Sequence, residues 1–200
     1  MKLLFDAVYY NNFDNKQIEY GVKFGNNTIV FIKVGFNGSI YGYNNKYLEI
    51  ANKLNEIYGY TVIVSSNPST RKNPLDVGFE IINKVVSYQN IKEYNVYYVG
   101  YSNGAMIGSR WGYLYNKIKK MLLINSPIMF NWPYQKEGLL KSKAEDILIV
   151  YSEYDQSIEF IELIKKIINN KIKLKIIPNT DHMFTNMKDK FISCIINYLK

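Results

Sequence analysis

The chain has 200 residues, a formal net charge of +8 and a 48% share of hydrophobic residues. This length and composition predict one globular domain over residues 1–200 and exclude an intrinsically disordered chain. No apolar run reaches the roughly 18 residues that a membrane helix needs, so we expect no membrane span. Because Asp6 interrupts the apolar start of the chain, we also expect no signal peptide.

The lysines are distributed along the chain rather than gathered in one basic segment, and no known nucleic-acid-binding motif is present. We therefore expect no nucleic acid partner. The single cysteine, Cys194, excludes an intramolecular disulfide, and its amphipathic surroundings indicate a buried thiol. Together these features favour a cytoplasmic location.

Strand-like and helix-like patterns alternate along most of the chain. The first two strands, at residues 3–10 and 17–24, are separated by an Asn-rich turn, which predicts a hairpin. Asn73-Pro74 is a typical helix start, and Gly59 is typical of a helix end. Further strands are expected at 28–34, 60–65, 95–99, 120–125, 146–151 and 171–177. Further helices are expected at residues 47–58, 157–169 and 185–199. Two more are expected: one that begins directly after Asn73, and one that follows Gly104 and ends at about residue 115.

This alternation predicts an α/β fold with a mostly parallel sheet, helices on both faces and an antiparallel hairpin at one edge. The segment 171–177 alternates lysine with aliphatic residues, which is typical of a sheet edge protected against aggregation. In the helix 157–169 we expect the inward-facing residues to be Ile161, Ile164 and Ile168.

The pentapeptide Gly100-Tyr101-Ser102-Asn103-Gly104 follows an apolar strand and precedes a helix-compatible segment. A G-x-S-x-G pattern in this context predicts a nucleophile elbow, a sharp turn with the serine at its tip. Side chains at the two glycine positions would collide with the neighbouring strand or helix. Ser102 is therefore the candidate nucleophile, and the alternative is a structural turn that happens to contain a serine.

A serine hydroxyl needs a base to act as a nucleophile, and that base needs an acid to orient it. His182 is the only histidine and follows the strand 171–177, so it is the candidate base. Asp155 follows the strand 146–151 and is the favoured acid, although Asp also commonly caps helices. Glu153 and Asp181 remain alternatives, with Asp181 disfavoured because it adjoins the histidine.

The order Ser102, Asp155, His182, each after a successive strand, resembles that of the α/β-hydrolase superfamily. The resemblance covers nearly the whole chain. Gly35-Phe36-Asn37-Gly38 is similar to the family's H-G-x-x-G loop, although Val34 replaces the usual histidine. By this resemblance the backbone N–H groups of Phe36 and Asn103 would form an oxyanion hole.

The resemblance implies a cofactor-independent enzyme, and neither a histidine-rich metal site nor a nucleotide-binding loop is expected. The interval 126–145 is too short for the cap domain that many members of the family contain. The sequence does not decide whether residues 126–145 form a small mobile lid. The apolar residues of this interval indicate either a wall of the substrate pocket or plain core packing. If they form a wall, the candidate substrate contacts, together with one residue of the elbow, are Tyr101, Met129, Phe130 and Trp132.

The resulting prediction is a serine hydrolase that cleaves an ester or thioester of a small molecule through an acyl-serine intermediate. The same residues would also serve an acyltransferase, in which an alcohol or amine replaces water. A third alternative is a binding protein on the same fold that has no catalytic activity.

Overall fold

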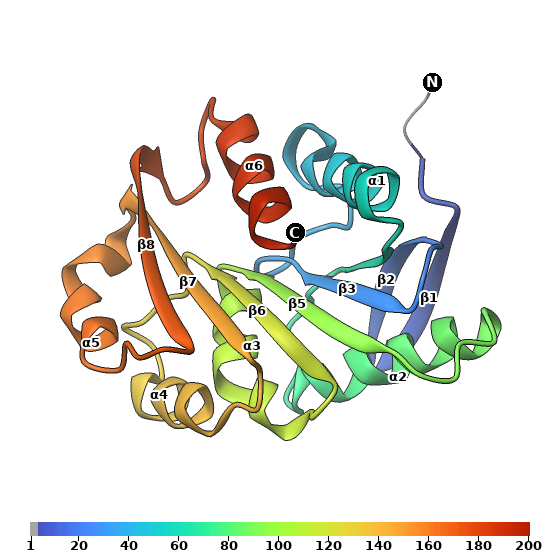
Figure 1. The fold of residues 1–200 in the computed structure, drawn as a ribbon, viewed down its shortest axis with the longest axis horizontal. Coiled ribbons are helices and arrows are strands. Elements are labelled where there is room, and N and C mark those ends of the chain that lie inside the picture. The colour runs from blue at the N-terminus through green and yellow to red at the C-terminus, as the bar shows by residue number, and fades with distance from the viewer. Residues whose placement is uncertain (1–3) are drawn as a thin grey trace.

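The computed structural model describes residues 4–200, and at its centre is an eight-stranded sheet in the order β1-β2-β4-β3-β5-β6-β7-β8 (Figure 1). The strands from β3 to β8 pair in parallel, while β2 pairs antiparallel with both β1 and β4. The strands are β1 (Ala7–Phe13), β2 (Lys16–Lys23), β3 (Thr28–Lys33), β4 (Thr61–Ser65), β5 (Asn95–Tyr101), β6 (Ile118–Ile124), β7 (Asp146–Tyr154) and β8 (Ile172–Asp181). The mostly parallel sheet with an antiparallel hairpin is therefore confirmed.

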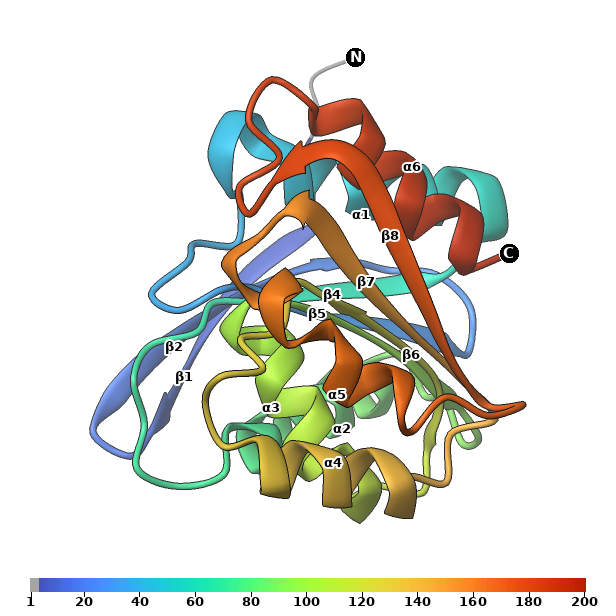
Figure 2. The same cartoon turned by 90° about the vertical axis from the view of Figure 1, so that its left-hand side faces the viewer.

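Helices α1 and α6 cover one face of the sheet, and α2, α3, α4 and α5 lie on the other (Figure 2). The helices are α1 (Lys46–Tyr58), α2 (Pro74–Tyr88), α3 (Asn103–Trp111), α4 (Trp132–Lys141), α5 (Ile161–Lys165) and α6 (Lys188–Tyr198). Alternate residues of the central strands enter two separate apolar clusters, one under each helical layer. In β3, for example, Phe31 belongs to one cluster and Ile32 to the other. Burial on both faces explains why these strands are almost continuously apolar.

The initial hairpin is confirmed, with a different turn from the one expected. Strand β1 continues through Phe13, and the reversal occurs at Asp14 and Asn15, which have φ angles of 51° and 59°. Consecutive residues with positive φ match the twist of a tight hairpin, and Asp and Asn tolerate this conformation well. Within the predicted strand 3–10, Leu3 lies outside the described residues.

The predicted helix at 157–169 is confirmed only for its middle part. A 3₁₀ turn, η3 (Gln156–Phe160), comes first, and the short helix α5 then ends at Lys165. The Asp155 carboxylate accepts a hydrogen bond from the Ser157 N–H, which starts a tight turn directly after β7. Ile164 is buried as expected, but Ile168 lies beyond the helix and is 45% exposed.

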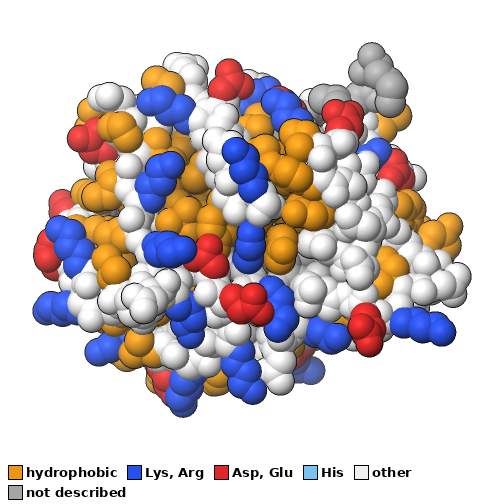
Figure 3. All heavy atoms as spheres, in the orientation of Figure 1, with side chains coloured by type: hydrophobic (Ala, Val, Ile, Leu, Met, Phe, Trp, Pro, Cys, Tyr) orange, Lys and Arg blue, Asp and Glu red, His pale blue; other side chains and the backbone are white. Residues whose placement is uncertain are grey.

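Strand β8 lies at the edge of the sheet, as its lysine pattern predicts. The Cys194 thiol is buried in α6, and burial raises its pKa to about 11. On the face that Figure 3 shows, Lys and Arg side chains are spread out and interspersed with acidic and apolar ones. Within residues 4–200, none of the helices combines the length and the apolarity that crossing a bilayer requires.

Candidate active site

Ser102 occupies a sharp turn between β5 and α3, with φ 53° and ψ −119°. The two flanking glycines explain why this strained turn forms. A Cβ on Gly100 would lie 2.6 Å from the Cα of Ala105, and one on Gly104 would lie 2.0 Å from the carbonyl oxygen of Lys33. Both distances are too short for any side chain, so only glycine allows α3 to pack this closely on β3 and β5.

The carboxyl ends of three parallel strands bring the predicted residues together. The Ser102 Oγ after β5 lies 3.0 Å from Nε2 of His182, which follows β8. The other ring nitrogen of His182, Nδ1, lies 2.5 Å from Oδ2 of Asp155, which follows β7. The Asp155 side chain is nearly inaccessible, whereas that of His182 is 39% exposed. A hydroxyl, an imidazole and a carboxylate thus form one hydrogen-bonded chain, which is buried at Asp155 and partly exposed at His182 and Ser102.

The environment of Asp155 favours its ionised form. Burial raises the pKa of this carboxyl, but the hydrogen bonds from His182 and from the Ser157 N–H outweigh it and hold the pKa below its usual value. An ionised carboxylate only accepts hydrogen bonds, so the Nδ1 of His182 must carry a proton. In the neutral imidazole, Nε2 is then free to accept a proton from Ser102.

The two alternative acids point elsewhere. An Oε2 atom of Glu153 accepts a 2.8 Å hydrogen bond from the N–H of Asn179. An Oδ1 atom of Asp181 accepts a 2.8 Å bond from the N–H of Thr185, and this bond lowers the pKa of Asp181. Of the three candidate acids, Asp155 is therefore the one that contacts His182.

Two buried residues hold the backbone of the histidine loop, the segment after β8 that contains His182. The carbonyl oxygen of His182 accepts hydrogen bonds from the Tyr101 hydroxyl (2.7 Å) and from Nδ2 of Asn125 (3.0 Å). Asn125 follows β6 and also exchanges hydrogen bonds with Ser152 of β7. Burial raises the pKa of the Tyr101 phenol, which keeps it a donor. Tyr101, predicted to contact substrate, is 5% exposed and lies beneath the histidine loop.

The loop after β3 passes beside the nucleophile. A Cβ on Gly35 would lie 3.5 Å from the Cβ of Ser102. The loop closes through a 2.9 Å bond from the Gly38 N–H to the carbonyl of Gly35. Across residues 4–200, neither the N–H of Phe36 nor that of Asn103 has a backbone or side-chain acceptor. Phe36 and Asn103 also line one cavity together.

Two cavities border this group of residues. The larger, about 440 Å³, lies on the His182 side, and its apolar lining includes Met129, Phe130 and Met183. The smaller, about 150 Å³, lies on the side of Phe36 and Asn103. Met129 and Phe130 are therefore where a substrate wall was expected. Trp132 is not, because it begins α4 and packs against the apolar cluster below the sheet.

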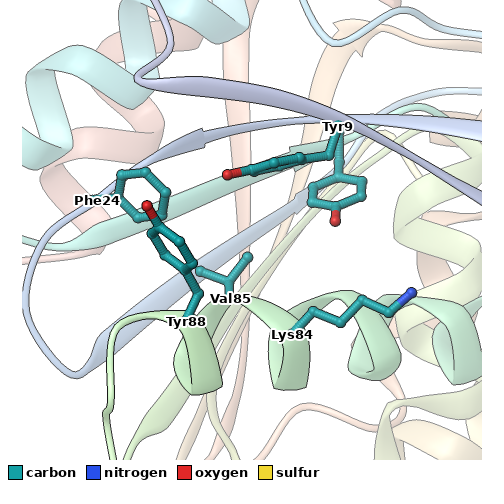
Figure 4. A pocket seen from close by; sticks show the side chains of 6 residues that line it. Tyr9, Phe24, Lys84, Val85 and Tyr88 are labelled. Atoms are coloured by element: carbon teal, nitrogen blue, oxygen red, sulfur yellow. The ribbon is translucent and has the colours of Figure 1, made fainter.

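A further cavity of about 250 Å³ lies away from Ser102, His182 and Asp155, between the hairpin and α2 (Figure 4). Figure 4 shows Tyr9 on the hairpin side facing Val85 and Tyr88 of α2, with Phe24 stacked near Tyr88. Ser102, His182 and Asp155 are not among the lining residues of this cavity, which are Tyr9, Tyr20, Phe24, Lys84, Val85 and Tyr88. This cavity therefore does not contribute to the candidate active site. In the described part of the chain, no cluster of His, Cys, Asp and Glu has the size of a metal site.

No protein-family model matches the sequence, and no curated protein matches it. Solved structures do match over nearly the full length of the chain. Est1E from Butyrivibrio proteoclasticus has a TM-score of 0.72 at 15% identity, with 96% of this chain and 97% of Est1E covered. An α/β serine hydrolase homologue from Coxiella burnetii has a TM-score of 0.71 at 14% identity, with both chains fully covered. The dienelactone hydrolase from Anabaena variabilis has a TM-score of 0.69 at 12% identity, with 96% and 95% covered.

Proposed function

Because the chain has the α/β-hydrolase fold, we propose that it is a serine hydrolase that cleaves a carboxylic ester or thioester of a small molecule. Similar structures include an esterase domain from Rhodothermus marinus and a thioesterase domain from the curacin biosynthetic pathway, which supports this class of reaction. The fold alone does not determine a reaction, so the proposal rests on the chemistry of the site.

The observation that carries the proposal is the chain of contacts from Ser102 to His182 to Asp155, with distances of 3.0 Å and 2.5 Å. In the proposed first step, Ser102 Oγ attacks the carbonyl carbon of the substrate while Nε2 of His182 takes the hydroxyl proton. Asp155 keeps Nδ1 protonated and stabilises the imidazolium that forms. The site thereby converts a weak nucleophile into a reactive one without a metal or cofactor.

The oxygen of the attacked carbonyl becomes negatively charged in the tetrahedral intermediate. We assign its stabilisation to the N–H groups of Phe36 and Asn103, which flank Ser102 and lack other acceptors in residues 4–200. Donors of this kind typically contribute about 3–4 kcal/mol each to stabilising the transition state. Asn103 is also the first residue of α3, so the positive end of the helix dipole lies at the same point.

Collapse of the intermediate breaks the bond to the leaving oxygen or sulfur, which takes the proton from Nε2 of His182. Water then attacks acyl-Ser102, gives its proton to His182, and releases the carboxylic acid together with free Ser102. In each half-reaction one proton moves to the imidazole and back, so the enzyme returns to its starting state.

The two cavities suggest how the substrate is oriented. The leaving atom must face Nε2 of His182, which places the leaving group in the cavity of about 440 Å³ beside Met129, Phe130 and Met183. The acyl group then lies towards Phe36 and Met106, where the cavity is only about 150 Å³. Drug-sized ligands usually occupy about 300–1,000 Å³, so this arrangement favours a short acyl group.

Hydrolysis of small esters and thioesters by the purified chain tests this function. We expect release of the carboxylic acid by the wild type and no turnover by Ser102→Ala. Addition of primary alcohols or amines distinguishes hydrolysis from acyl transfer, because an acyltransferase would form the new ester or amide instead of the free acid. Equal turnover by the wild type and Ser102→Ala would contradict the proposal.

A further inference from the structure

Asn67 lies in the loop after β4, is 2% exposed, and contacts both segments that hold the proposed oxyanion donors. Its Nδ2 donates a 2.9 Å hydrogen bond to the carbonyl oxygen of Val34, two residues before Phe36. The same Nδ2 donates a 2.9 Å bond to the side-chain Oδ1 of Asn103. The backbone carbonyl oxygen of Asn67 accepts a further 2.9 Å hydrogen bond from the backbone N–H of Asn37, one residue after Phe36.

Simple donor and acceptor chemistry fixes the orientation of these amides. The carbonyl oxygen of Val34 can only accept, so Asn67 must direct Nδ2 towards it. Since Nδ2 is a donor with two hydrogens, its second contact must be with the oxygen of the Asn103 amide. Both hydrogens of Nδ2 are therefore donated, one to the segment that holds Phe36 and one to the side chain of Asn103.

Few side chains could replace this amide. Serine has a single hydroxyl donor, and aspartate has none at neutral pH. With Asp at position 67, a carboxylate oxygen would face the Val34 carbonyl, and two acceptors would repel each other. The Asp side chain would have the same shape as Asn but would lack the two hydrogen bonds to Val34 and Asn103.

We infer that Asn67 is a positioning residue that sets the separation of the Phe36 and Asn103 N–H groups, an inference that rests on the proposed hydrolase function. The two donors come from the ends of β3 and β5, and the loop after β4 connects them. An oxyanion hole requires its donors to lie about 2.7–3.1 Å from the developing charge. Without the Asn67 side-chain bonds, the loop that holds Phe36 would shift and the spacing of the two donors would change. Ser102, His182 and Asp155 would keep their positions.

The experiment compares Asn67→Ala and Asn67→Asp with the wild type on p-nitrophenyl acetate. Asn52→Ala is the matched control, because Asn52 is also buried and its Nδ2 donates to the carbonyl of Leu48 within α1. We expect kcat to fall by about 10- to 100-fold in both Asn67 variants, as misplaced groups typically cause, with KM unchanged. Asn52→Ala should keep the wild-type kcat at a comparable loss of thermal stability.

The pH profile and a covalent probe separate positioning from a general loss of structure. In Asn67→Ala, which adds no charge, the midpoint of kcat/KM against pH should not move, because the Asn67 side chain bonds to Val34 and Asn103 and not to His182. The rate of labelling by a fluorophosphonate should fall in parallel with kcat, since the phosphoryl oxygen uses the same donors. Should Asn67→Ala not fold, Asn67→Ser, which keeps one neutral donor, supplies the comparison without adding a charge beside the oxyanion.

Wild-type kcat in both Asn67 variants would overturn this inference and leave the hydrolase proposal intact. A loss of kcat no larger than that of Asn52→Ala, or a displaced pH midpoint in Asn67→Ala, would overturn it as well. If the wild type neither turns over esters nor is labelled, the proposed function fails, and the role of Asn67 fails with it.

Discussion

The hydroxyl of Tyr101 donates a 2.7 Å hydrogen bond to the backbone carbonyl oxygen of His182. Tyr101 directly precedes Ser102, so the residue that ends β5 also fixes the loop that holds the proposed base. We predict that Tyr101→Phe lowers kcat several-fold and costs about 1 kcal/mol of stability, a typical value for one hydrogen bond. The effect stays moderate because Asn125 also donates to this carbonyl.

Urea unfolding and ester kinetics on the same samples check this prediction. Tyr60→Phe is the control, because the Tyr60 hydroxyl donates to the carbonyl of Leu199, away from Ser102, His182 and Asp155. This variant should lose similar stability and keep its activity. Unchanged kcat in Tyr101→Phe would show that the hydrogen bond does not position His182.

Asp155→Asn should lower kcat by about 10⁴-fold while leaving the fold intact, the size of effect seen when the acid of a serine protease is replaced in this way. An amide can donate to Nδ1 and so favours the wrong tautomer of His182. Glu153→Gln should behave like the wild type, because Glu153 binds the N–H of Asn179 instead. The reverse result, with Glu153→Gln inactive and Asp155→Asn active, would assign the acid to Glu153.

Much of the candidate site could be predicted because its residues follow local patterns. The glycines around Ser102 are required by contacts as close as 2.0 Å, and such a requirement leaves a recognisable motif. The chain contains one histidine, which left a single candidate base. Asp155 and His182 each follow a strand, and the ends of parallel strands meet at one edge of the sheet.

Asn67 and Asn125 could not be predicted in the same way. Each is one asparagine in a loop, and its partners are distant in the sequence. No local pattern reports which side chain a loop amide will meet. The same limit explains Tyr101 and Trp132: their aromatic character indicated contact surfaces, but only the packing of α6 and α4 determines which surface each one meets.

Lys33 gives a prediction for the pH dependence of stability. Its side chain is 1% exposed, its Nζ donates to the carbonyl of Ser66, and burial lowers its pKa to about 7. An unfolded lysine keeps its proton up to about pH 10.4, so the unfolded chain binds more protons above pH 7. The contribution of Lys33 to the free energy of unfolding should therefore be lowest below pH 7 and should rise as the pH increases above 7.

Urea unfolding of the wild type and Lys33→Met between pH 6 and pH 9 measures this contribution. The wild type should gain stability relative to Lys33→Met as the pH rises through about 7. Lys92→Met, which replaces an exposed lysine, should keep a constant difference from the wild type. A constant difference for Lys33→Met as well would show that Lys33 is not titrating near neutral pH.

The small cavity beside Phe36 leads to a prediction about acyl length. Each methylene adds about 0.8 kcal/mol of binding energy only where the protein encloses it, and this cavity is about 150 Å³. In a series of p-nitrophenyl esters from acetate to palmitate, below micelle formation, kcat/KM should level off or fall after a few carbons. A steady rise through the long-chain esters would reveal an apolar channel that binds the whole chain.

The most direct test of the account is fluorophosphonate labelling of the purified chain, followed by mass spectrometry of its peptides. The Ser102 Oγ lies 3.0 Å from Nε2 of His182, the proposed base, and the N–H groups of Phe36 and Asn103 are its proposed oxyanion donors. We therefore predict stoichiometric labelling at Ser102 and at no other serine. Ser102→Ala should not react, and His182→Ala should react almost as little, because the chain has no second histidine. Stoichiometric labelling that persists in Ser102→Ala, or a wild type that is not labelled, would contradict the assignment of Ser102 as the nucleophile.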